Sequence, residues 1–165
     1  MDRDAVASHI PRLRRYARAL VGDRYQADDL VQDTLERALN KLHLWRPGSD
    51  MRAWLFAVMH NVFVNQLRGK RPDTMALVDD DAIAAPVGTV DRLEIRDLQA
   101  ALMEIPAEQR AVVLLVGLEE MSYAEAAKPL GVPIGTMMSR VARGRERLRH
   151  LMAGTQTAPS LKVVK

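Results

Sequence analysis

Apolar residues recur at intervals of three and four along most of the chain, which is the spacing of one face of an α-helix. Near the start, Ile10, Leu13, Ala17 and Leu20 keep such a face. A second stripe follows over Ala27, Leu30, Val31, Leu35, Ala38, Leu39 and Leu42. No segment alternates apolar and polar residues as a half-buried strand does. The pattern therefore predicts an all-α protein.

Breaks in this pattern separate the next helices. Pro47 and Gly48 end the second stripe, and Ser49 or Asp50 can cap a third helix that runs to Gly69. The apolar positions of this third helix are Trp54, Leu55, Val58, Val62 and Phe63. After a gap, the pattern resumes with a helix that carries Ile95, Leu98 and Leu102 and stops before Pro106, followed by a helix over residues 107–118.

The last part of the chain has the layout of a helix-turn-helix. Ser122 with Glu125 three residues later forms a capping box that starts a short helix, and Gly131 ends it. Pro133 suits the first position of a longer helix that runs to about Met152. A short capped helix, a glycine-containing turn and a longer helix are the parts of a DNA-binding helix-turn-helix.

Charge divides the chain into three segments. Residues 1–71 carry 13 basic and 8 acidic residues, residues 72–92 carry 1 and 5, and residues 93–165 carry 10 and 8. The acidic middle segment, with Pro72, Pro86, Gly88 and three consecutive aspartates at 79–81, has the composition of a linker. We therefore predict two small helical domains, at residues 1–71 and 92–152, joined by a flexible acidic linker at 72–91 and followed by a flexible tail at 153–165. Each domain alone is of a size at which a core is only marginally stable.

Composition excludes several classes of protein. The chain has no cysteine, so a disulfide scaffold, a thiolate metal site and a cysteine nucleophile are excluded. No apolar run approaches the length of a membrane span, and the first residues lack the apolar core of a secretory signal. We expect a cytoplasmic protein without membrane insertion, cofactor or metal.

The longer helix of the predicted helix-turn-helix is strongly basic. Between Arg140 and Arg149 there are five arginines and one glutamate. Arginine at this density suits contact with phosphates and with guanine, and hydroxyls near the helix start can reach bases or phosphate. The alternative is a solvated basic face on an ordinary helical hairpin. The candidate DNA-contacting residues are Thr136, Ser139, Arg140, Arg143, Arg145 and Arg147.

Two further surfaces lie in the first domain. Asp29, Gln32, Asp33 and Glu36 share the polar side of the second helix, which is compatible with a solvated face, an aspartate-rich magnesium site or a protein-docking surface. The third helix combines aromatic, amide and basic residues, the groups that hold unpaired bases. Its candidates are Asn61, Asn65, Trp54, Arg68, Lys70 and Arg71, although a tryptophan at this spacing is more often part of a core. His43 and His60 have no partner at ligand spacing.

The order of these parts resembles the extracytoplasmic-function (ECF) sigma factors of bacterial RNA polymerase. The resemblance covers about residues 8–152, with the best matches in ADDLVQDTLERAL, MRAWLFAVMHNVFVNQLR and the stretch from LMEIPAEQR to GRERLR. Some segments look most like the branch that includes general stress response factors. The family has two helical domains, called region 2 and region 4, joined by a linker.

The resemblance implies a role for each surface. Asp29, Gln32 and Asp33, with Glu36 beside them, match the face that docks on the clamp coiled coil of the polymerase β′ subunit. Asn61 and Asn65 match positions near the pocket for a base flipped out of the minus-ten element. Thr136, Ser139, Arg140 and Arg143 match the helix that contacts the minus-thirty-five element. The linker would follow the path of nascent RNA, the β flap would be a second polymerase contact, and an anti-sigma factor is an expected partner.

Three positions depart from the family pattern. Met138 stands where a basic residue is usual, Val116 and Gly117 stand where some members have a charged pair, and Pro129 interrupts the short helix and is expected to end it early. These departures put the exact minus-thirty-five contacts in question.

The functional hypothesis is a promoter-specificity subunit that makes and breaks no bond itself. One rival is a sigma-like decoy that binds an anti-sigma factor and never contacts DNA. A second is a repressor that binds DNA without polymerase, and a third is a metal-dependent enzyme built on the aspartate cluster.

Overall fold

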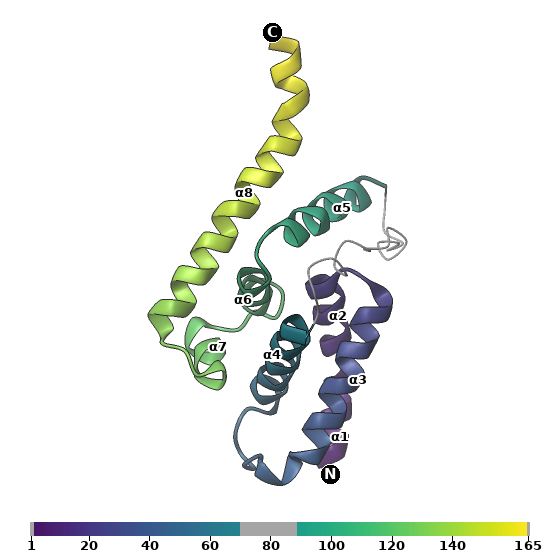
Figure 1. The fold of residues 1–165 in the computed structure, drawn as a ribbon, viewed down its shortest axis with the longest axis vertical. Helices are drawn as coiled ribbons and strands as arrows, with labels where there is room; N and C mark the ends of the chain where they lie inside the picture. The colour runs from purple at the N-terminus through teal and green to yellow at the C-terminus, as the bar shows by residue number, and fades with distance from the viewer. Residues whose placement is uncertain (1, 70–88, 165) are drawn as a thin grey trace.

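The computed structural model describes residues 2–69 and 89–164, and within them the chain is entirely helical apart from turns (Figure 1). The all-α prediction is confirmed. The elements are α1 (Asp2–Ser8), α2 (Ile10–Val21), α3 (Arg24–Asn40), η1 (Leu42–Leu44), α4 (Met51–Gly69), α5 (Thr89–Glu104), α6 (Ala107–Gly117), α7 (Tyr123–Leu130) and α8 (Ile134–Val164). The predicted linker lies outside the described residues, except for its last three, which belong to α5.

Local capping chemistry sets several helix ends. The Asp23 side chain accepts hydrogen bonds from the amides of Tyr25 and Gln26 and so starts α3. The predicted capping box is confirmed at α7, where Ser122 and Glu125 bond each other's backbone amides at 3.0 and 2.8 Å. Gly131 ends α7 in the left-handed conformation, with φ of 70°, which glycine adopts without a steric penalty.

Two helices are longer than their sequences indicate. Pro129 lies inside α7, which continues to Leu130 instead of ending early. A proline in the last turn removes one backbone hydrogen bond, and the following amides of Gly131 and Val132 still bond to Lys128 and Ala127. The helix α8 extends past Met152 to Val164, through residues such as glycine and proline that disfavour a helix interior and that made the pattern predict an earlier end.

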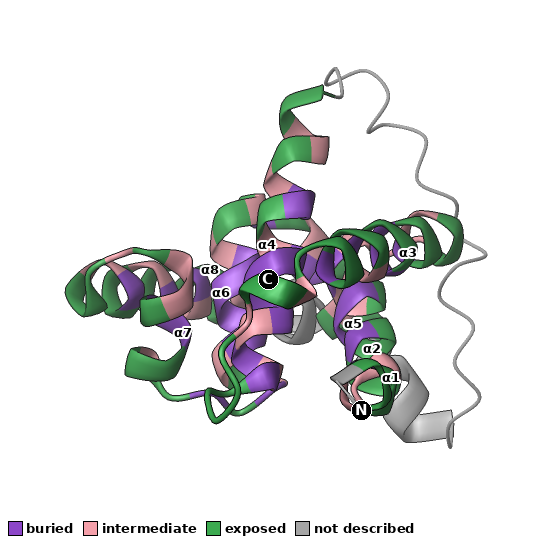
Figure 2. Ribbon diagram, turned by 90° about the horizontal axis from the view of Figure 1, so that it is seen from below, coloured by how far each residue is buried: buried purple, intermediate pink, exposed green. Residues whose placement is uncertain are grey.

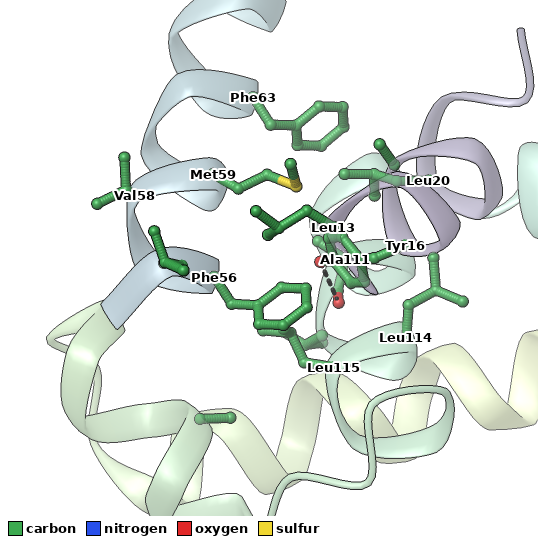
Figure 3. Close-up of a cluster of buried hydrophobic side chains, with 14 of the residues drawn as sticks. Leu13, Tyr16, Leu20, Phe56, Val58, Met59, Phe63, Ala111, Leu114 and Leu115 are labelled. Atoms are coloured by element: carbon green, nitrogen blue, oxygen red, sulfur yellow. Dashed lines mark hydrogen bonds between the residues drawn. The ribbon is translucent and has the colours of Figure 1, made fainter. Parts of the chain in front are cut away.

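The two halves of the chain share one hydrophobic core. Side chains of α2 and α4 from the first half meet side chains of α6 from the second half (Figure 3). Tyr16 and Phe56 pack edge to face, with ring centroids 5.1 Å apart, and Leu13 and Leu115 are fully buried beside them. Because each half alone is small, burying apolar surface against the other half stabilises both.

Polar contacts cross the same boundary. The Arg15 guanidinium lies 3.2 Å from the buried Glu119 carboxylate, and Arg52 donates a hydrogen bond of 3.0 Å to the Glu119 carbonyl. The Tyr16 hydroxyl donates to the Ala111 carbonyl at 2.9 Å. Through Glu119, the turn between α6 and α7 therefore contacts both α2 and α4.

Candidate docking and nucleic-acid-binding surfaces

The outer side of α3 carries the four predicted docking residues. Asp29, Gln32, Asp33 and Glu36 are all exposed, while the opposite side of the helix buries Leu30 and its neighbours (Figure 2). We call these four residues the acidic surface. The separation arises because polar and apolar positions alternate at helical spacing.

The acidic surface borders a groove between α3 and α4. The groove has a volume of about 740 Å³. Gln66 of α4 lines the groove and donates a hydrogen bond of 3.0 Å from Nε2 to Oδ2 of Asp33. The sequence did not assign Gln66 to docking, because a contact between residues 33 positions apart leaves no local signal. The lining residues are Asp33, Glu36, Arg37, Asn40, Lys41, Val62, Asn65 and Gln66.

The candidate minus-ten residues on α4 occupy different environments. Asn61, Asn65 and Arg68 are exposed, whereas Trp54 is half-buried and packs against the hydrophobic core. Asn65 also lines the groove beside Asp33, so the structure brings one candidate of the DNA surface next to the candidate docking surface. Lys70 and Arg71 lie outside the described residues.

His60 lies on α4 at the boundary with the second half. Its Nδ1 atom is buried without a hydrogen-bond partner. Burial lowers the pKa of His60; the charge of Glu108 from α6 opposes this shift, and the charge of Arg140 from α8 adds to it. A candidate DNA-contacting arginine therefore lies close to α4. His43 is exposed on η1.

In the second half, α7 and α8 form the predicted helix-turn-helix, and α8 packs on α6 (Figure 1). The buried side of α8 carries Met137, Val141 and Gly144. Gly144 allows a close approach, because a Cβ atom at this position would lie 2.5 Å from Cγ2 of Val113 on α6. This packing fixes which side of α8 faces outward.

The exposed side of α8 includes only part of the predicted set. Ser139, Arg143 and Arg147 are exposed, while Thr136, Arg140 and Arg145 are half-buried. Met138 is exposed, as the sequence pattern predicts, and Ala142, which the sequence did not single out, is exposed on the same side. The four-residue spacing between them puts both residues on one side of the helix.

The part of the chain that the structure describes holds no group of three or more acidic, histidine or cysteine side chains placed to bind a metal ion. None of the described helices combines the length and apolar character needed to cross a membrane.

Comparison with known proteins agrees with this arrangement. Residues 6–60 match the family model for the sigma2 domain of PhyR, and residues 95–148 match the model for sigma-70 region 4. The chain is 38% identical to the ECF RNA polymerase sigma factor EcfG of Rhodopseudomonas palustris, over 91% of this chain and 84% of that protein. It is 34% identical to SigE of Mycolicibacterium smegmatis, over 95% of this chain and 64% of that protein.

Among solved structures, the sigma factor RpoE in complex with the anti-sigma factor NepR from Bartonella quintana is similar, with a TM-score of 0.74 and 34% identity. The match covers 90% of this chain and 94% of that one. The identity and coverage of these relatives, together with two family models in the expected order, show that the chain belongs to the ECF sigma factors of bacterial RNA polymerase.

Proposed function

We propose that this sigma factor docks on core RNA polymerase through the acidic surface, contacts the minus-thirty-five element with α8 and holds unpaired bases of the minus-ten element with α4. Two exposed surfaces support the proposal. One is the carboxylate and amide surface on α3, and the other is the arginine-containing side of α8. The first suits a basic protein partner and the second suits DNA.

In this proposal the acidic surface contacts the β′ clamp coiled coil. Four exposed polar residues on one helix side, three of them acidic, offer charge complementarity to a basic coiled coil. The adjoining groove gives that partner a concave surface to enter. The β flap is a second proposed contact on the polymerase.

The minus-ten contact uses the exposed amides of α4. Asn61 and Asn65 are four residues apart and lie on one side of the helix, where each amide offers donor and acceptor groups to the edge of an unpaired base. Arg68, with Lys70 and Arg71, supplies cations for the phosphates. The linker at residues 72–91 follows the path of nascent RNA.

The minus-thirty-five contact uses Thr136, Ser139 and the arginines of α8. Of these, Ser139, Arg143 and Arg147 are exposed in the structure, whereas Thr136, Arg140 and Arg145 are half-buried.

An anti-sigma factor is a proposed partner, because the similar sigma factor RpoE was solved in complex with the anti-sigma factor NepR. The protein acts in the cytoplasm and catalyses no reaction itself, since the polymerase forms the bonds.

Run-off transcription with purified core polymerase tests the proposal. Templates come from transcript starts mapped after overexpression of this chain. Transcripts that require the chain and start at these sites are expected. A chain that binds an anti-sigma factor yet gives no transcript from any mapped template would instead be a decoy.

A further inference from the structure

Two large apolar side chains are exposed at the start of α8. Ile134 is 50% exposed and Met138 is 48% exposed. Within the described part of the chain, neither side chain packs against the hydrophobic core. Their exposure leaves a small apolar surface on α8 in contact with water.

These side chains form one row on the helix surface. Ile134, Met138 and Ala142 follow each other at four-residue spacing, and all three are exposed. We call them the apolar row. The adjacent row, Gly135, Ser139 and Arg143, is also exposed.

The setting of the apolar row determines what can cover it. It lies on the outer side of the second helix of a helix-turn-helix, where residues near the helix start contact base edges in the major groove. The neighbouring arginines are complementary in charge to DNA phosphates. The apolar group that base pairs present in the major groove is the 5-methyl of thymine.

We propose that Met138, supported by Ile134, contacts the 5-methyl group of a thymine in the minus-thirty-five element and so determines part of the promoter specificity. A lysine or arginine at this position would donate hydrogen bonds to guanine. The thioether of Met138 has no donor and covers a methyl group by apolar contact. This inference rests on the proposed function, because it concerns the same DNA surface.

The experiment uses holoenzyme assembled from the full chain and core polymerase. A promoter library with a randomised upstream element is selected for transcription, and the selected duplex is the probe. Each thymine of the upstream element is then replaced in turn by deoxyuridine, which removes the 5-methyl group alone. The affinity of the holoenzyme is measured for each duplex, with wild type, Met138→Ala and a control, Leu98→Ala, whose side chain is also exposed but lies on α5.

At one or two positions, removal of the methyl group is expected to weaken wild-type binding about fourfold, the factor that corresponds to roughly 0.8 kcal/mol for one buried carbon group. Met138→Ala is expected to bind the thymine duplex about fourfold more weakly and to bind the thymine and deoxyuridine duplexes equally. Leu98→Ala should behave as wild type. Because Met138 is exposed, thermal melting of Met138→Ala should match that of wild type.

Three results would overturn the inference: no position sensitive to the methyl group, a selected element without thymine in either strand, or a Met138→Ala variant that still distinguishes the two duplexes. If Met138→Ala weakened binding to the thymine and deoxyuridine duplexes by the same factor, the apolar row would contact protein and not the methyl group. The proposed function is judged separately, by whether wild-type holoenzyme transcribes from the selected promoters at all.

Discussion

The hydroxyl of Tyr16 on α2 donates a hydrogen bond of 2.9 Å to the main-chain carbonyl of Ala111 on α6, 95 residues away in the sequence (Figure 3). Tyr16 is fully buried. Burial is the main cause that raises its pKa; the charge of Glu119 adds to this shift and that of Arg110 opposes it. The hydroxyl therefore keeps its proton and remains a donor. This bond links the two halves inside their shared core.

Replacing Tyr16 with Phe should lower the free energy of unfolding by about 1 kcal/mol, since one buried hydrogen bond is lost while the ring still packs on Phe56. Urea denaturation measures this change. Tyr25→Phe is the control, because Tyr25 is 74% exposed and its hydroxyl is solvated. Equal stability of wild type and Tyr16→Phe would show that the bond contributes nothing to joining the halves.

Gly144→Ala should destabilise the protein by about 1–3 kcal/mol, because the new methyl group would overlap Val113 on α6. Val113→Ala in the same chain should restore part of the loss by making room.

Gly135 lies on the open side of the same helix, with no atom within 4 Å of an added Cβ. Gly135→Ala should therefore raise stability by about 0.5–1 kcal/mol. Thermal melting of the three variants measures these effects, and a neutral Gly144→Ala would contradict the close packing.

His60 should make stability depend on pH. Because burial lowers its pKa in the folded chain, the folded state disfavours the protonated imidazole that the unfolded state accepts near pH 6.5. Stability should be greatest above pH 6.5 and fall as the pH drops below it, until the folded state also takes up the proton. The pKa of His9 is lowered in the same direction, chiefly by burial, so His60 accounts for part of the effect.

Urea denaturation at pH 7.5 and 5.5 measures the slope. His60→Gln should lose less stability between these pH values than wild type does. His43→Gln, which changes an exposed histidine, should keep the wild-type slope. If His60→Gln and wild type had the same slope, His60 would not contribute to the pH dependence.

Most of the helices were predictable because their signals are local, although the pattern indicated neither α1 nor η1. The capping box of Ser122 and Glu125, the left-handed Gly131 and the apolar stripes each lie within a few residues. The packing of the two halves was not predictable. An apolar stripe indicates that one side of a helix is buried, but it does not indicate which element covers that side. Glu119 illustrates the difficulty: composition would place a carboxylate on the surface, yet it is buried beside Arg15, 104 residues away.

The candidate sites were also predictable where the signal is local and not where it depends on tertiary packing. The acidic surface on α3 follows from one helix period, so its four residues are exposed together. Which side of α8 faces outward depends on the packing of Gly144 against α6. This is a tertiary contact, which the local sequence does not indicate. Thr136 and Arg140 are therefore half-buried, while Met138 and Ala142 are exposed.

Asp33→Arg should weaken assembly with core polymerase by at least about tenfold, because it places a positive charge where the proposed partner is basic. Asp97→Arg makes the same charge change at an exposed position on α5 and should assemble normally. Asp33→Arg also removes the hydrogen bond from Gln66, so Gln66→Ala separates that loss from the charge effect. Competition binding to core polymerase measures assembly. Asp33→Arg with wild-type affinity would contradict docking through the acidic surface.

Asn61→Ala and Asn65→Ala should have different effects, because the two amides have different surroundings. Both are exposed on α4, but Asn65 also lines the groove beside Asp33, whereas Asn61 is not among the groove residues. Asn61→Ala should therefore leave polymerase assembly unchanged and lower promoter opening about tenfold, consistent with the roughly 1–3 kcal/mol that a specific base contact contributes. Asn65→Ala should impair opening and also weaken assembly.

Permanganate reactivity of unpaired thymines measures opening, and competition binding measures assembly. Asp97→Asn, which changes an exposed side chain on α5 away from the groove, is the control for opening. If Asn61→Ala reduced assembly and opening equally, Asn61 would act in docking or folding and not on unpaired bases. A loss of opening confined to Asn61→Ala and Asn65→Ala would locate the base-contacting surface on the exposed side of α4 and its border with the groove.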